Sequence, residues 1–217
     1  MIKIESQLAE KYLASNATTA KEHAEHVMEL LKANDTKEIN CQLSTKLNNT
    51  LSDFVKAFES GKPSDSTVKD KASKFGNALS DVVSARIDKQ QLDNVTVKVL
   101  VVKDLVAGTL KNYKHSLGMS DANNDKNNNT SSSKSNQNNI MDEADYESAQ
   151  ADVSRAIELY NELKSSGNAK SIELLNALIS LKDKIDSKSP FDQAEKIVEH
   201  KIITMGDEFD NDNLRFC

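Results

Sequence analysis

The sequence is poor in the residues that make turns and covalent crosslinks. Its 217 residues include six glycines, two prolines, two cysteines and no tryptophan. Sandwiches and barrels of short strands need turn residues roughly every 8–12 positions, so this scarcity excludes them and predicts long helices with few breaks. Cys41 and Cys217 cannot form a disulfide framework, since they allow one bridge at most.

Long apolar runs are also missing. A membrane-spanning helix needs about 18 or more consecutive apolar residues, and the densest apolar stretch here, residues 95–107, is interrupted by Lys98, Lys103 and Asp104. We therefore predict no integral membrane segment. The first residues, MIKIESQLAEKY, contain no apolar core of the kind found in signal peptides. This predicts a cytoplasmic protein or, alternatively, an exported one whose signal has already been removed.

Catalytic and phosphate-binding motifs are absent from the chain. The nucleophile pattern G-x-S-x-G does not occur, and neither G-x-G-x-x-G nor G-x-x-x-x-G-K-[ST] is present. Lysines and acids are interleaved through residues 1–118, which carry a net charge of +2, so there is no basic patch of the kind that binds nucleic acid. We predict that the protein is not an enzyme and does not bind nucleic acid.

One segment divides the sequence by composition. Residues 120–139 contain eight asparagines, five serines and a single apolar side chain, Ala122. Such a segment buries too little apolar surface to offset its ordering entropy, which predicts a flexible linker over 120–140. Residues 141–217 carry nine basic and seventeen acidic side chains, so the acidity of the chain lies in this second part. The predicted domains are 1–119 and 141–206, followed by an acidic tail at 207–217.

Apolar residues spaced three and four apart recur on both sides of that segment and predict an all-α protein. Residues 95–102 are rich in valine and could form a strand, but a single strand would have no partner, so we favour a helix. We expect an antiparallel four-helix bundle and a smaller acidic three-helix segment, which would dock on the bundle or on a partner because its core is small. The expected helices span 5–32, 37–59, 65–88 and 89–117, then 142–164, 169–185 and 190–205.

The two parts resemble each other. Residues 28–30 (Met-Glu-Leu) align with residues 157–159 (Ile-Glu-Leu) at an offset of 129, and Pro63 aligns with Pro190 at an offset of 127. One interpretation is the duplication of a helical unit, with the fourth helix lost from the second copy. The alternative is convergence, because amphipathic helix pairs joined by Gly/Pro turns look alike in any case.

Two histidines are the strongest candidates for a binding site. His23 and His26 are three residues apart, which places both imidazoles on one face of a helix. There they could chelate a divalent transition metal such as zinc, copper or nickel. The third ligand could be Glu29, one turn further on, or else His115 or His200. The other interpretation is that both histidines are ordinary side chains of an amphipathic helix.

Three strings resemble a known group of proteins. AKEHAEHVMELL, VVSARIDKQQLDNVTVKVLVV and FDQAEKIVEHKI are similar to segments of uncharacterised, Asn-rich and often exported helical-bundle proteins of some archaea. The resemblance implies a helical fold and an envelope setting, and no site residues carry over from it. N-x-S/T sequons, which accept glycans in exported proteins and also arise by chance in an Asn-rich chain, begin at Asn16, Asn48, Asn94, Asn128 and Asn129.

These observations leave three hypotheses about function. We expect a non-enzymatic helical binding or structural module that acts through a protein partner or through self-association. The first alternative is a metal-binding bundle that uses His23 and His26. The second is an exported, glycosylated component of the cell envelope.

Overall fold

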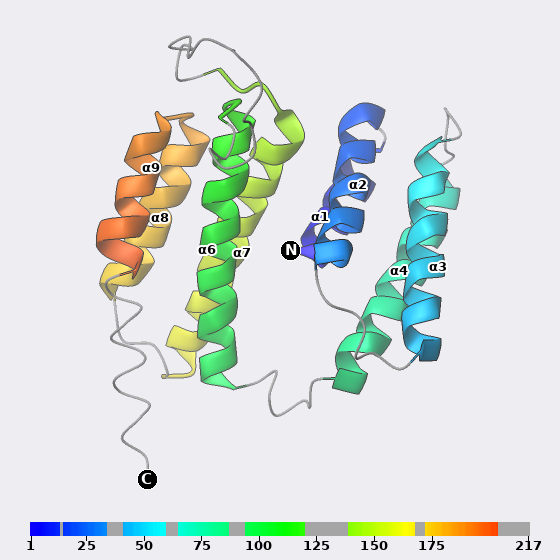
Figure 1. Cartoon of the computed structure of the whole chain (residues 1–217). Coiled ribbons are helices and arrows are strands. Elements are labelled where there is room, and N and C mark those ends of the chain that lie inside the picture. The colour runs from blue at the N-terminus through cyan, green and yellow to red at the C-terminus, as the bar shows by residue number, and fades with distance from the viewer. Residues whose placement is uncertain are drawn as a thin grey trace, which may run out of the picture. The chain divides into compact units, whose positions relative to one another are not determined.

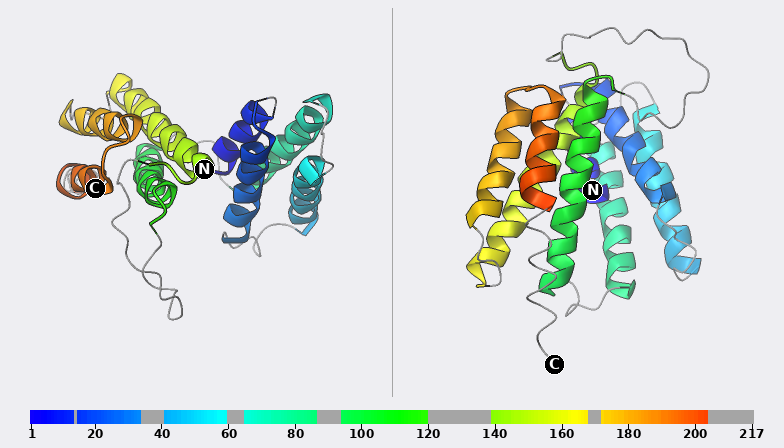
Figure 2. Two further views of the ribbon diagram at one scale, coloured as in Figure 1. Left: turned by 90° about the horizontal axis from the view of Figure 1, so that it is seen from above. Right: turned by 60° about the vertical axis from the view of Figure 1, so that its left-hand side comes forward.

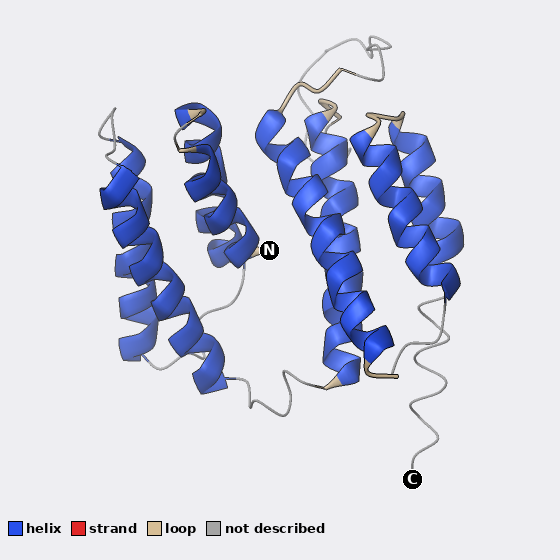
Figure 3. Cartoon of the chain, turned by 180° about the vertical axis from the view of Figure 1, so that it is seen from behind, coloured by secondary structure: helices blue, strands red, loops and turns tan. Residues whose placement is uncertain are grey.

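The protein is built from helices. Within the described ranges the backbone forms helices and the turns that join them, and no strand occurs (Figures 1 and 3). The predicted all-α class is therefore confirmed. None of the helices in these ranges is both long enough and apolar enough to cross a membrane. The computed structural model describes residues 1–13, 15–33, 41–59, 65–86, 94–119, 139–167 and 172–203.

The helices group into two compact units, and the first of them is Met1–Asn94, here called the N-terminal unit. It contains α1 (Ile2–Tyr12), α2 (Ala17–Ala33), α3 (Cys41–Glu59) and α4 (Asp65–Arg86). The principal packing pairs are α1 with α2 and α3 with α4, and further contacts join α2 to α3 and α1 to α4. Each helix of this unit therefore has at least two neighbours among the other three.

The single helix predicted over 5–32 is wrong, because the chain turns between Tyr12 and Ala17. The carbonyl oxygen of Tyr12 accepts hydrogen bonds from the backbone N–H of Ser15 (3.1 Å) and of Asn16 (2.8 Å). The side-chain oxygen of Asn16 accepts from the backbone N–H of Thr19 at 3.2 Å. Asparagine is among the best N-cap residues, so Asn16 opens a new helix, and the tight turn allows α1 to pack on α2.

The core of the N-terminal unit is a cluster of buried apolar side chains from all four helices. Phenylalanines stand at its centre: Phe54 and Phe75 stack in parallel with ring centroids 5.9 Å apart, and Phe58 meets Phe54 edge to face. The helical stripe predicted for 37–59 supplies much of this core, and α1 supplies one fully buried member, Ala9. The remaining buried members are Ala20, Ala24, Val27, Leu31, Leu47, Leu51, Val55, Val68, Ala72, Ala78 and Val82.

The second unit is Val95–Cys217, here called the C-terminal unit. Its helices are α6 (Val95–Ser116), α7 (Glu143–Ser165), α8 (Ile172–Asp186) and α9 (Phe191–Ile197), which continues into the π-helical turn η1 (Val198–Ile203). The helix α7 packs along α6 and α8, and α9 contacts α8 and α6. Figure 2 shows the helices of each unit from two further directions.

The valine-rich stretch at residues 95–102 is helical, as predicted, and forms the start of α6. Its buried side chains follow helical spacing along one side, while Leu100 and Val101 are exposed. A strand would have buried every second residue instead. The buried positions of α6 are Val99, Val102, Leu105, Val106, Gly108, Thr109, Tyr113 and Ser116.

The two units divide at a different place from the predicted domains. The boundary falls between Asn94 and Val95, whereas the sequence predicted one domain over 1–119 and a second over 141–206. The helix α6, assigned above to the first bundle, packs on α7 and belongs to the C-terminal unit. The reason is the long buried side of α6, which α7 covers.

The Asn/Ser-rich segment connects two helices of the same unit. Residues 120–138 and the predicted tail at 207–217 lie outside the described residues. On either side of that segment, the carbonyl oxygen of Ser116 accepts hydrogen bonds from the backbone N–H of Met141 (2.7 Å) and of Asp142 (3.2 Å). Asp142 also caps α7, because its side chain accepts from the backbone N–H of Asp145 at 2.9 Å. The end of α6 is thus held directly against the start of α7.

Candidate metal centre

A carboxylate and two imidazoles meet between α1 and α2. Glu5 comes from α1, and His23 and His26 come from α2. One potential ligand atom from each residue can be chosen so that all three atoms lie within 4.8 Å of one another. Carboxylate oxygen and imidazole nitrogen are common ligands of zinc and other divalent transition metals.

The turn at Asn16 explains why these residues meet. Along one continuous helix, Glu5 and His23 would be about 27 Å apart, since each residue adds roughly 1.5 Å. The turn allows α1 to pack beside α2, which brings Glu5 to the level of His23. The two histidines are one helical turn apart and share the face of α2 that meets α1.

The oxygen Oε2 of Glu5 is the centre of the cluster. It lies 2.9 Å from Nδ1 of His23 and 3.5 Å from Nδ1 of His26. When Glu5 is ionised its carboxylate can only accept hydrogen bonds, and in that state the Nδ1–H tautomer of His23 is the donor. The ring of Tyr12 stacks on the ring of His23, with centroids 5.8 Å apart. This stacking fixes the plane of the His23 imidazole.

The cluster is buried at one end and open at the other. The side chains of His23 and Glu5 are 0% and 4% exposed, whereas that of His26 is 27% exposed. A buried carboxylate is costly unless it is paired and hydrogen-bonded, and the histidines supply that pairing. The exposure of His26 gives solvent, or an ion from solvent, a route to the cluster.

The structure groups the two predicted histidines with Glu5, which the sequence analysis did not name, and metal binding by these residues stays a prediction. The structure brings His23 and His26 together, but Glu29 is exposed on α2 and is not part of the cluster. His115 and His200 lie on α6 and η1 of the C-terminal unit. The signal that could have found Glu5 is the Ser-Asn pair before Ala17, because a helix start there folds α1 back on α2.

A groove with a mixed polar and apolar lining lies on the other side of α1, between α1 and α4. Its volume is about 280 Å³. Burial beside this groove raises the pKa of Glu10, and the positive charge of Lys69 opposes that rise. The groove is lined by polar side chains from α1 and by polar and apolar residues from α4: Lys3, Ser6, Gln7 and Glu10 from α1, with Ala72, Ser73, Phe75, Asn77 and Leu79 among those from α4.

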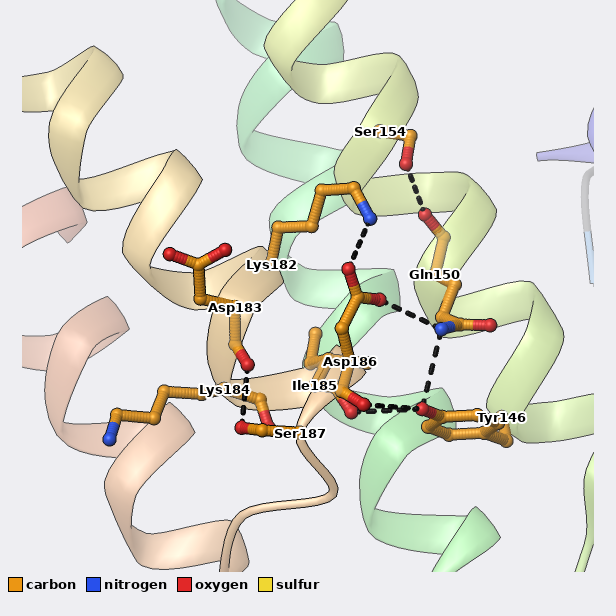
Figure 4. A network of polar contacts seen from close by, with 9 residues as sticks. All are labelled: Tyr146, Gln150, Ser154, Lys182, Asp183, Lys184, Ile185, Asp186 and Ser187. Atoms are coloured by element: carbon orange, nitrogen blue, oxygen red, sulfur yellow. Dashed lines mark hydrogen bonds and ion pairs between the residues drawn. The ribbon is translucent and has the colours of Figure 1, made fainter.

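The C-terminal unit contains a polar network around the end of α8 (Figure 4). The hydroxyl of Tyr146 donates to the carbonyl oxygen of Ile185 at 3.0 Å and accepts from Nε2 of Gln150 at 3.3 Å. Gln150 also donates to Oδ1 of Asp186 at 2.8 Å, and Lys182 donates to the other carboxylate oxygen. Carbonyl groups in the last turn of a helix have no partner within the helix, so this network satisfies the end of α8 and ties it to α7.

The sequons occupy varied positions. Asn16 is the N-cap of α2, and Asn48 and Asn94 are exposed. Asn128 and Asn129 lie outside the described residues. The glycosylated, exported protein therefore stays a hypothesis drawn from the sequence.

Comparison of the chain with protein-family models, with curated proteins and with solved structures found no match.

Proposed function

We propose that this protein is a non-enzymatic helical binding module whose N-terminal unit binds a divalent transition-metal ion through Glu5, His23 and His26. The observation that carries the proposal is the convergence of three ligand atoms from two helices within 4.8 Å. Exposed clusters of acidic side chains are common in proteins that bind no metal. Here, by contrast, two of the three candidate ligand side chains, Glu5 and His23, are buried.

The distances fit a metal site as well as they fit a hydrogen-bonded cluster. In a tetrahedral zinc site with bonds of about 2.0–2.1 Å, neighbouring ligand atoms are roughly 3.3 Å apart. The separations of 2.9 Å and 3.5 Å from Oε2 of Glu5 to the two histidine nitrogens lie on either side of that value. The third separation, between the two histidines, is within 4.8 Å, and coordination would require the ligand atoms to close to about 3.3 Å.

The ligand set suits several metals. Two imidazoles and one carboxylate are compatible with zinc, copper, nickel and iron, and a water molecule would complete a tetrahedral shell on the side where His26 is exposed. Zn²⁺ is the most informative probe, because it has no redox chemistry and accepts this geometry readily.

Isothermal titration of the full, chelator-treated chain with Zn²⁺ tests the proposal. We expect one high-affinity site per chain. Changes to residues around a metal site already weaken affinity by about 10–100-fold, so loss of a direct ligand in Glu5→Gln should cost at least as much. The double variant His23→Ala plus His26→Ala should lose the site.

The matched control is Glu29→Gln. This variant also replaces a carboxylate by an amide, but at Glu29, the third ligand that the sequence predicted, which is exposed on α2. Zinc affinity should not change in this variant. Glu5→Gln keeps the size of the side chain and its capacity to accept from His23, and circular dichroism would verify that it is folded. A wild-type chain that binds no zinc, or a folded Glu5→Gln chain that binds it as tightly as wild type, would contradict the proposed site.

A further inference from the structure

On the basis of the metal site proposed above, we infer that metal binding fixes α1 to the rest of the N-terminal unit, so that α1 acts as a metal-dependent latch. The three ligands are divided unequally between the helices. Glu5 is the one contribution of α1, and both histidines belong to α2. A bound ion would therefore be a crosslink between α1 and α2.

The helix α1 is weakly held by apolar packing. It has 11 residues, and isolated helices shorter than about 12–15 residues are marginal in water. Its buried residues are Glu5, Ser6, Leu8 and Ala9, so half of them are polar. Ile2, Tyr12 and Leu13 add contacts that are only partly buried. By comparison, α3 buries Leu47, Leu51, Phe54, Val55 and Phe58.

The opposite side of α1 offers little further attachment. The groove of about 280 Å³ between α1 and α4 is bordered on the α1 side by Lys3, Ser6, Gln7 and Glu10. All four of these side chains are polar and face Ala72, Phe75 and Leu79 on the α4 side, so attachment across this groove is only partly apolar. The position of α1 therefore depends chiefly on its contact with α2, where Glu5 meets His23.

Opening of α1 would break the metal site and uncover part of the core. The core cluster to which Ala9 belongs includes Ala20, Ala24 and Val27 on α2. With α1 detached, α2 would keep two ligands instead of three and would bind the ion more weakly. An ion that binds the closed form more tightly must shift the equilibrium towards it. Metal would thus control the exposure of this surface.

Hydrogen exchange measured by mass spectrometry on the full chain tests the latch. At a free zinc concentration about 100 times the dissociation constant, amide exchange in α1 should slow by up to 100-fold. The slowing of exchange will be smaller if the opened form still binds zinc through His23 and His26, because only the difference in affinity between the two forms counts. Peptides from α3 are the internal control and should change little, because no ligand lies on that helix.

Two variants separate the latch from general stabilisation. Glu5→Gln should lose the zinc-dependent slowing in α1. Glu5→His restores a metal ligand at the same position and should recover it. Glu29→Gln should behave as wild type.

The possible outcomes distinguish this inference from the proposed function. If zinc binds with the expected dependence on Glu5 but α1 exchanges at the same rate with and without metal, the latch is wrong and the metal site stands. Equal slowing in α1 and α3 would also overturn the latch, since α1 would then open only with the whole unit. If no zinc binds, both ideas are wrong.

Discussion

Nδ2 of Asn112 lies 3.2 Å from Oδ2 of Asp152, and this hydrogen bond joins α6 to α7 inside the C-terminal unit. Asp152, which is 1% exposed, follows His23 in the sequence by 129 residues, the offset that aligns the two parts of the chain. In the N-terminal unit, His23 is a buried polar residue of α2 and is held by Glu5 from α1. Each unit therefore links its first two helices through a polar pair with at least one buried member.

The correspondence extends to neighbouring positions. At the same offset, buried Thr19 matches buried Ser148, and buried Ala20 matches buried Ala149. Convergence on an amphipathic pattern would match apolar positions with one another, but it gives no reason for buried polar residues to match. The matches support duplication of a helical unit. With α6 as the first helix of the C-terminal unit, the second copy need not have lost a helix.

Removal of the donor to Asp152 should destabilise the C-terminal unit. In Asn112→Ala, the buried carboxylate has one hydrogen-bond donor fewer, and hydrogen bonds to charged groups contribute about 1.5–3 kcal/mol. Urea denaturation of the full chain should show a loss of that size in the free energy of unfolding. The exposed Asn161→Ala on α7 is the control and should change stability by less than about 0.5 kcal/mol. Equal stability of the two variants would show that the pair contributes nothing.

The sequence predicts the helices of this protein better than it predicts how they pack. Leu47, Leu51, Phe54 and Phe58 follow a helical stripe, and all four are buried in α3 as expected. Spacing along one helix is a local property, and it can be read without knowing the neighbours. The composition of residues 120–139 marks a segment poor in apolar side chains, but composition does not say whether the helices on its two sides pack on each other. The structure shows that α6 and α7 do.

The cluster of the proposed metal site was predictable only in the part that lies on one helix. His23 and His26 are neighbours through helical geometry alone, whereas the approach of Glu5 depends on a turn 11 residues further along the chain, at Asn16. The chain has 34 acidic side chains, and without that turn none of those outside α2 could be preferred. Glu29 was favoured because it is one helical turn from His26, yet it faces solvent.

The cap of α2 should affect both stability and metal binding. In Asn16→Ala, the backbone N–H of Thr19 loses its acceptor, and loss of an N-cap costs about 0.5–2 kcal/mol. Thermal denaturation should show a lower midpoint, and zinc affinity should fall because the same turn brings Glu5 to His23. Asn48→Ala, at an exposed position of α3, should leave both quantities unchanged. An unchanged midpoint for Asn16→Ala would mean that this cap does not stabilise α2.

The hydroxyl of Tyr146 should matter more than the exposed ion pair beside it. Tyr146→Phe removes the donor to the carbonyl oxygen of Ile185, and a hydrogen bond of this kind contributes about 0.5–1.5 kcal/mol net. Lys182→Ala removes a partner of Asp186 from the same network, but both side chains are more than one-third exposed. Surface ion pairs contribute about 0–1 kcal/mol. Urea denaturation should therefore rank Tyr146→Phe as the less stable variant, and the reverse order would contradict this account of the network.

The phenol of Tyr113 should make the protein sensitive to alkali. Tyr113 is fully buried and donates to the carbonyl oxygen of Ser189. Burial, and secondly the neighbouring Tyr146, raises the pKa of Tyr113 to about 12 from the usual 10.0. Between those two pH values the unfolded chain loses this proton while the folded chain keeps it, so stability falls as pH rises through that interval. Below pH 10 the phenol is protonated in both states, and stability should not depend on its titration.

Spectrophotometric titration at the phenolate absorption band, combined with denaturation at each pH, measures this effect. Tyr113 should ionise later than an ordinary tyrosine, together with or just before unfolding. In Tyr113→Phe the hydrogen bond to Ser189 is lost, so the variant should be less stable at neutral pH. Its stability should nevertheless decline less steeply between pH 10 and 12, because one perturbed group no longer titrates. Ionisation of all four tyrosines near pH 10 in a chain that remains folded would show that the Tyr113 hydroxyl is accessible to solvent.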